Sequence, residues 1–189
     1  MLNRWQSIFL ISIFLASCTS LQEKSPETFQ LTEREHLYKK TKWSFSGRIA
    51  LADKNESFSA AIMWSHKDEK DELEVSGPFG QGRTVIVIDK HSVVIDYGDE
   101  RLQYFGSVDA LVSRQLGVAM PVSALKYWVL GLVEPETAYV MQGRGFIQSK
   151  WLVSYLGMQQ VGVESLPRKF RAERERTKLK LIIDQWDVD

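Results

Sequence analysis

A single cysteine, Cys18, stands among the 189 residues, so no disulfide can form within the chain. Stability must therefore come from packing, and apolar residues make up 44% of the sequence, enough for a sizeable core. An excess of charge of one sign is also lacking, because 24 Lys and Arg balance 24 Asp and Glu. This balance argues against a general preference for nucleic acid or another polyanion. At this length we expect one folded domain.

Residue clusters for metal binding or catalysis are lacking as well. His36, His66 and His91 show no metal-ligand spacing and are expected at the surface. The carboxylates of residues 68–72 are better explained by a solvated hairpin than by an acid and base pair, since this stretch is the least apolar of the chain. The glycines of residues 77–82 do not form a dinucleotide fingerprint, because a strand is predicted after them. The sequence therefore predicts no catalytic residue, no metal site and no cofactor.

The N-terminus carries an export signal. A positive charge at Arg4 precedes an apolar run from Ile8 to Ala16, which is too short for a membrane-spanning helix and is typical of a secretory signal. The run closes with Leu15-Ala16-Ser17-Cys18, which resembles the bacterial lipobox, and a chance cysteine at an ordinary cleavage site fits less well. We therefore expect a lipoprotein signal peptide over residues 1–17 and a covalent lipid anchor on Cys18.

The polar residues that follow predict a flexible tether over 18–31. Thr19 follows Cys18. In Gram-negative lipoproteins, which this segment resembles, a residue other than aspartate at this position usually implies export to the outer membrane. A single domain is then predicted over residues 32–189.

Alternating apolar residues predict many short strands in this domain. The expected strands cover residues 43–51, 58–64, 72–76, 83–89, 92–97, 102–105, 138–141, 146–148, 151–156, 161–164, 169–173 and 179–186. Their short connections require antiparallel neighbours, so one meandering sheet is predicted. Residues 66–71 are expected to be a charged hairpin loop.

Three short helices are predicted between these strands. The capping-box spacing of Thr32 and Glu35 predicts a helix to about Thr41. Ser107 can cap a second helix that ends at Gly117, and a third runs from Pro121 to before Gly131. The last two are apolar along one stripe, so we expect them to cover the concave side of a curved sheet.

The turn between two predicted strands holds an unexplained aromatic residue, Phe79. Turn chemistry accounts for Gly77, Pro78, Gly80 and Gly82, but it does not require an aromatic ring. Phe79 either folds back into the core, which is the more common outcome, or stands in solvent to enter an apolar environment. The residues alone leave both alternatives open.

Large rings and basic residues form two further features. Six rings are candidates for the lining of an apolar cavity, although packing alone is the more frequent explanation of such rings: Trp43, Phe45, Trp64, Trp128, Trp151 and Tyr155.

Residues 168–180 contain seven basic residues against two glutamates. A solvated hairpin and a surface for anionic headgroups or an acidic partner explain this segment equally well.

These motifs together resemble the LolB family of outer-membrane lipoproteins over nearly the whole chain. The resemblance rests on the order and spacing of the lipobox at Cys18, Trp43, Gly47-Arg48, Trp64, Gly77-Pro78-Phe79-Gly80, Leu116-Gly117, Met120-Pro121-Val122, Leu125, Trp128, Gly131, Trp151, Tyr155, Leu166-Pro167 and residues 179–186. Lys150, where the family usually has glycine, and Leu132 to Pro135, in place of a shorter turn, depart from the pattern.

The resemblance implies a mainly β (α+β) fold, a half-open antiparallel β-barrel whose apolar concave side is covered by short helices. It implies a monomer without enzymatic activity, anchored in the outer membrane by Cys18 and facing the periplasm. Such a protein accepts acylated lipoproteins from a periplasmic LolA-like carrier and inserts them among the outer-membrane phospholipids. Phe79, with Gly77, Pro78 and Gly80, would then form the membrane-insertion loop. The alternative is a lipid-anchored envelope module that binds a small apolar ligand or a structural partner.

Overall fold

The computed structural model describes residues 29–54, 56–77 and 80–189. The predicted signal peptide 1–17, the acylation site Cys18 and most of the predicted tether 18–31 lie outside the described residues, as do Pro78 and Phe79.

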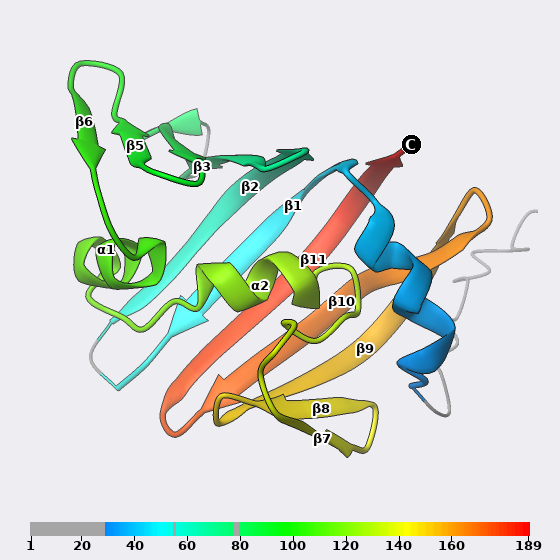
Figure 1. The fold of residues 1–189 in the computed structure, drawn as a ribbon. Coiled ribbons are helices and arrows are strands. Elements are labelled where there is room, and N and C mark those ends of the chain that lie inside the picture. Colours follow the sequence, from blue (N-terminus) through cyan, green and yellow to red (C-terminus); the bar gives the residue numbers. More distant parts are fainter. Residues whose placement is uncertain (1–28, 55, 78–79) are drawn as a thin grey trace, which may run out of the picture.

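The described part of the chain forms one antiparallel sheet of 11 strands (Figure 1). In spatial order these are β6 (Arg101–Tyr104), β5 (Val93–Asp96), β4 (Thr84–Ile88), β3 (Lys70–Ser76), β2 (Ser57–Lys67), β1 (Lys42–Ala52), β11 (Thr177–Val188), β10 (Glu164–Arg174), β9 (Trp151–Val161), β8 (Gly145–Gln148) and β7 (Tyr139–Gln142). The two ends of the domain meet in the middle, where β1 pairs with β11. β6 and β7 are the edges, so the sheet is a half-barrel that stays open.

The alternation of buried and exposed residues confirms the predicted faces of the central strands. In β1, Trp43, Phe45, Ile49 and Leu51 are buried, and Arg48 between them is exposed. A bulge interrupts this strand pair, because Ser46 lies opposite Gln185 whereas the next residue, Gly47, lies opposite Ile183. A Cβ atom on Gly47 would lie 2.2 Å from the carbonyl oxygen of Ile182, so only glycine fits this close approach.

The helices lie on one face of the sheet (Figure 1). α1 (Val108–Leu116) begins as predicted, with the Ser107 hydroxyl accepting the N–H of Ala110, and ends at Gly117 in the left-handed conformation. α2 (Val122–Trp128) follows, with Pro121 at its N-cap. No helix within the described ranges is both long and apolar enough to cross a membrane.

The first predicted helix differs from the expectation in type and in its cap. It is the 3₁₀ helix η1 (Thr32–Lys39), its N-cap is Leu31, and no side chain caps it. The predicted capping box of Thr32 and Glu35 is therefore wrong. Tertiary contacts hold η1 instead, since Arg34 and Leu37 are buried in this helix.

Two hairpins also differ from the prediction. The strand expected at residues 161–164 is a turn in which Val163 is 93% exposed, and β9 and β10 are longer strands on either side of it. The loop expected at residues 66–71 shrinks to the turn Asp68–Glu69, because β2 and β3 extend to Lys67 and Lys70.

Replacing Gly47 by alanine tests the close approach at the β1–β11 bulge. We expect Gly47→Ala to lower the free energy of unfolding by about 2 kcal/mol, because either the backbone of β11 or that of β1 must shift. Ser46→Ala, at the neighbouring half-buried position, should change it by less than about 0.5 kcal/mol. Urea unfolding followed by tryptophan fluorescence measures both, and equal losses for the two variants would contradict the packing described here.

Candidate functional site

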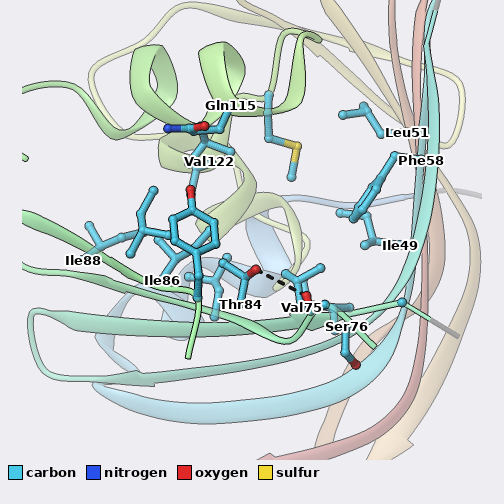
Figure 2. Close-up of a pocket in the computed structure, with 18 residues that line it drawn as sticks. Ile49, Leu51, Phe58, Val75, Ser76, Thr84, Ile86, Ile88, Gln115 and Val122 are labelled. Atoms are coloured by element: carbon cyan, nitrogen blue, oxygen red, sulfur yellow. Dashed lines mark hydrogen bonds between the residues drawn. The ribbon is translucent and has the colours of Figure 1, made fainter. Parts of the chain in front are cut away.

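An apolar cavity of about 220 Å³ lies between the sheet and the two α-helices (Figure 2). Its walls come from three parts of the fold. β1 and β2 supply Ile49, Leu51, Phe58 and Ile62; β3, β4 and β5 supply Leu73, Val75, Ser76, Thr84, Ile86, Ile88 and Ile95; the helical region supplies Val112, Gln115, Met120 and Val122. Figure 2 shows Gln115 and Val122 on the helical side, opposite Thr84, Ile86 and Val75 on the strands.

The side chains of β3 to β5 explain why this space stays hollow. β-branched residues suit extended strands but have short side chains, and Ile86 and Ile88 line the cavity while they also pack against the cluster of Val93, Ile95 and Leu111. α1 is held at a distance because Leu111 packs on Val93 and Ile95, farther along the same sheet. The space between is therefore lined by aliphatic groups and is left unfilled.

Polar groups are confined to a few positions of the lining. They are Ser76, Thr84, Tyr97 and Gln115. The Thr84 hydroxyl donates to the carbonyl oxygen of Gly82 at 3.4 Å (dashed line in Figure 2), so part of this polarity is satisfied within the turn. The remaining lining is hydrocarbon, which suits an apolar ligand with one polar end.

The cavity adjoins the turn that was predicted to insert into a membrane. Gly77 and Gly82, at the two sides of that turn, both line the cavity. The Gly77 N–H donates to the carbonyl oxygen of Gln81 at 2.8 Å, which closes the turn. Phe58 and Tyr97, each 37% exposed, also belong to the lining and are open to solvent. An apolar group leaving the cavity on this side would pass beside residues 77–82.

The six rings predicted as cavity lining lie elsewhere in the core. All six are between 0% and 3% exposed, and none belongs to the lining of the cavity under α1. Trp43, Phe45 and Trp64 form one cluster with Trp186, with ring centroids 5.1 to 6.3 Å apart along β1, β2 and β11. These six rings fill their part of the core, and the cavity falls where the strands carry mostly aliphatic residues, together with Phe58 and Tyr97.

The other three rings, Trp128, Trp151 and Tyr155, lie where α2 packs on the sheet. The rings of Trp128 and Trp151 lie 6.1 Å apart, and the Tyr155 hydroxyl donates to the carbonyl oxygen of Trp128 at 2.9 Å. The Trp128 indole N–H donates to the side-chain oxygen of Gln148 at 3.0 Å. Full burial raises the pKa of Tyr155 far above its ordinary value, so the hydroxyl stays a donor at any physiological pH.

Gln148 and Arg34 hold α2 and the segment after it in place, and neither was identified from the sequence. The Gln148 amide also bonds the backbone of Glu134 and Thr137, which fixes the segment after α2. Arg34 donates to the carbonyl oxygens of Leu130 and Gly131 at 2.6 and 3.1 Å, beyond the end of α2. Burial lowers the pKa of Arg34, although its guanidinium remains a cation at physiological pH. α2 is thereby fastened at its C-terminal side by groups far away in the sequence.

A buried ionic cluster fastens the other side of α2 and corrects two expectations. His66 and Asp71, expected in a solvated hairpin, are each only 5% exposed. The Asp71 carboxylate is 2.9 Å from His66 Nδ1, accepts the indole N–H of Trp64 at 2.9 Å, and lies 3.3 Å from the Nζ of Lys126 on α2. His66 and Asp71 are therefore buried beside α2, whereas residues 67–70 between them are exposed as expected.

The cluster sets the ionisation of Asp71. Burial by itself would raise the pKa of this carboxyl, but hydrogen bonds from His66 and Trp64 and the charge of Lys126 outweigh burial and hold the pKa below its ordinary value. A carboxyl with a lowered folded pKa contributes stability above its unfolded pKa, and this contribution is lost as the pH falls through the folded pKa.

The geometry defines a class of fold, an open antiparallel half-barrel that holds an apolar cavity under two helices. The family model for the outer membrane lipoprotein LolB matches residues 41–186. Outer-membrane lipoprotein LolB of Chromohalobacter salexigens is 30% identical over 97% of this chain and 90% of its own length, and that of Nitrosococcus oceani is 30% identical over 96% of each. The chain belongs to the LolB family of outer-membrane lipoproteins.

A solved structure supports the fold independently of sequence. A LolA superfamily protein from Nitrosomonas europaea superposes with a TM-score of 0.51 over 80% of this chain and 87% of its own, at 6% sequence identity. At that identity the likeness concerns the fold alone. It confirms the predicted half-open barrel with helices over its concave side.

Removing the charge of Asp71 tests the fastening of α2. We expect Asp71→Asn to cost about 3 kcal/mol of unfolding free energy at neutral pH, because Lys126 and His66 lose a buried partner. The difference from the parent should shrink as the pH falls below about 4, since the carboxyl of the unfolded parent chain then becomes protonated and the folded carboxyl follows at lower pH.

A control is the exposed ion pair between Arg48 and Asp184, 2.9 Å apart. Asp184→Asn should cost less than about 1 kcal/mol. Chemical unfolding of both variants at several pH values measures this, and a loss for Asp71→Asn that is the same at pH 7 and pH 3 would contradict the account.

Proposed function

We propose that the chain receives the acyl groups of lipoproteins in the cavity under α1 and delivers them to the outer membrane beside residues 77–82. The single observation that carries this proposal is the position of the cavity, whose lining includes both Gly77 and Gly82. The same site then holds the acyl groups of the cargo and releases them to the membrane. Anchorage in the outer membrane, as in the family, keeps that site close to the bilayer.

The free energies favour a direct handover of cargo between two apolar cavities. Each methylene group exposed to water costs about 0.8 kcal/mol, so several acyl chains cannot cross water unshielded. A periplasmic LolA-like carrier is the donor that the family implies. The handover needs no external energy source if this cavity binds acyl chains more tightly than the carrier does, because a tenfold preference corresponds to only about 1.4 kcal/mol. The proposed role requires no catalytic group.

The size of the cavity indicates that it opens on loading. About 220 Å³ is below the range of roughly 300 to 1,000 Å³ typical of ligand pockets. α2 is fastened by Asp71, Gln148 and Arg34, whereas α1 rests on the sheet through the apolar side chains of Val108, Leu111 and Val112. The side chains of Asp109 and Ser113 on α1 accept the backbone N–H groups of Ser123 and Met120, at or just before the start of α2, rather than groups of the sheet. We therefore expect α1 to move outward from β4 and β5 when acyl chains enter.

The small volume also favours one second candidate, a lipid-anchored module that keeps a small apolar ligand in the same cavity. Native mass spectrometry separates the two candidates. The receptor is expected to bind a lipoprotein released by the carrier, whereas the module would retain a small ligand and take no lipoprotein.

Filling the cavity should block receipt of cargo. Ile86 lines the cavity and Val87, the next residue of β4, does not. With the mature chain carrying Cys18→Ala, we expect Ile86→Trp to reduce capture of an acylated lipoprotein from its carrier about tenfold, as the indole occupies the space of the acyl chain. Val87→Trp should capture cargo normally. Co-purification measures capture, and normal capture by a folded Ile86→Trp variant would place the acyl site elsewhere.

A charge on the adjoining turn should block delivery alone. Placing a charged side chain in the bilayer costs about 3 kcal/mol, so Phe79→Glu in the acylated chain should slow insertion of cargo into vesicles at least tenfold while leaving capture intact. Gln81→Glu adds the same charge two residues away and is expected to have a smaller effect. Insertion by Phe79→Glu at the parent rate would remove the proposed role of Phe79.

A further inference from the structure

The β10–β11 hairpin carries an excess of positive charge that the fold neutralises only in part, through the ion pair of Arg171 with Glu173 at 3.8 Å. Between residues 171 and 180 the chain has five basic side chains against Glu173 and Glu175. Four of the basic residues are exposed, and they are Arg171, Arg176, Lys178 and Lys180. Arg174 is half-buried with its guanidinium 4.8 Å from the ring centroid of Trp151. We refer to Arg171, Arg174, Arg176, Lys178 and Lys180 as the basic hairpin.

The strand register places like charges opposite each other. Arg171 on β10 is the direct partner of Lys180 on β11, an arrangement that destabilises a sheet, whereas the next pair on this face, Glu173 and Lys178, has opposite charges. Their next neighbours across the sheet are Ser154 on β9 and Ala50 on β1, which bring no charge. Within the described part of the chain, no carboxylate lies within 4 Å of the amino group of Lys178 or Lys180. An excess of positive charge remains on this surface, and an anionic partner would stabilise it.

The basic hairpin lies toward the same end of the sheet as the proposed delivery turn. β11 begins beside the end of β1, since Lys178 pairs with Ala52. β2 starts at this end, opposite Ala52, and β3 runs back toward it and finishes at Ser76, just before the turn. Strands β2 and β1 separate the two features, so a bilayer that extends along this end of the sheet can contact both.

The composition of the surface favours a lipid partner over a protein. Protein interfaces are enriched in aromatic residues and arginine and depleted in lysine. The basic hairpin has arginine and lysine, but no exposed large apolar side chain belongs to the described residues 168–180. Flexible basic side chains around a turn suit the phosphate groups of anionic headgroups, which need charge more than shape.

We propose that the basic hairpin binds the phosphate groups of anionic lipids and so turns the mouth of the cavity toward the bilayer. The inference rests on the proposed function for the orientation it serves. A single anchor point at Cys18 does not fix that orientation, because Phe29 follows it by 11 positions and a chain of that length can reach up to about 35 Å. The basic hairpin supplies the missing constraint.

The two ends of β10 provide a direct test of orientation. The sequence has no cysteine besides Cys18, so Thr177→Cys and Val163→Cys each give one site for a fluorescent label, at opposite turns of this strand. The acylated chain is reconstituted in vesicles of phosphatidylcholine, with or without about one quarter phosphatidylglycerol, and energy transfer to a headgroup-labelled lipid is measured.

We expect phosphatidylglycerol to bring the label at residue 177 closer to the bilayer than the label at residue 163, and added salt to reverse this. The combined Arg171→Gln, Lys178→Gln and Lys180→Gln variant should lower the population facing the bilayer about fivefold per charge removed. Its matched control removes three charges at the opposite end of the sheet, through Lys67→Gln, Lys70→Gln and Lys90→Gln, and should leave the orientation unchanged.

Two outcomes would overturn the proposal. One is energy transfer that does not depend on phosphatidylglycerol or is the same in the two triple variants. The other is normal energy transfer in the basic-hairpin variant together with slower capture of cargo, which would assign the surface to the carrier. Capture is scored separately, because its loss in the parent chain would refute the proposed function, whereas the orientation measurement would still stand.

Discussion

The structure depends on one constraint, which is that an antiparallel sheet of 11 described strands curls without closing. A closed barrel would fill or seal its own interior, whereas this sheet leaves an apolar concave face that other segments must cover. α1, α2 and η1 lie on that face. Their fastening decides which part of the concave side is filled and which part can take a ligand.

The concave face is divided by the size of its side chains. Under α2 the rings of Trp128, Trp151 and Tyr155 fill the space, and buried hydrogen bonds from Gln148 and Arg34 hold the helix. Under α1 the strands carry mostly aliphatic residues, and the cavity remains. Rigid packing on one side and a hollow on the other suit a protein that must keep its fold while cargo enters and leaves.

The sequence predicts those features that local chemistry determines. Ser107 and Gly117 bound α1 as expected, because a cap and a left-handed glycine act within one turn of helix. His66 and Asp71 were misjudged as exposed, since their burial depends on α2, which lies far along the chain and contributes Lys126. The resemblance to the LolB family predicted the half-barrel, but ring size alone could not locate the cavity. Whether six rings line a space or fill it is decided by how the elements pack.

The central claim is that acyl chains occupy the space between α1 and strands β3 to β5. A crystal structure of the chain with a triacylated lipopeptide tests this most directly. The account predicts acyl density against Ile86 and Val112, with α1 displaced outward and the lipid head beside residues 77–82. Acyl density on the convex face of the sheet, or among the rings beneath α2, would contradict it.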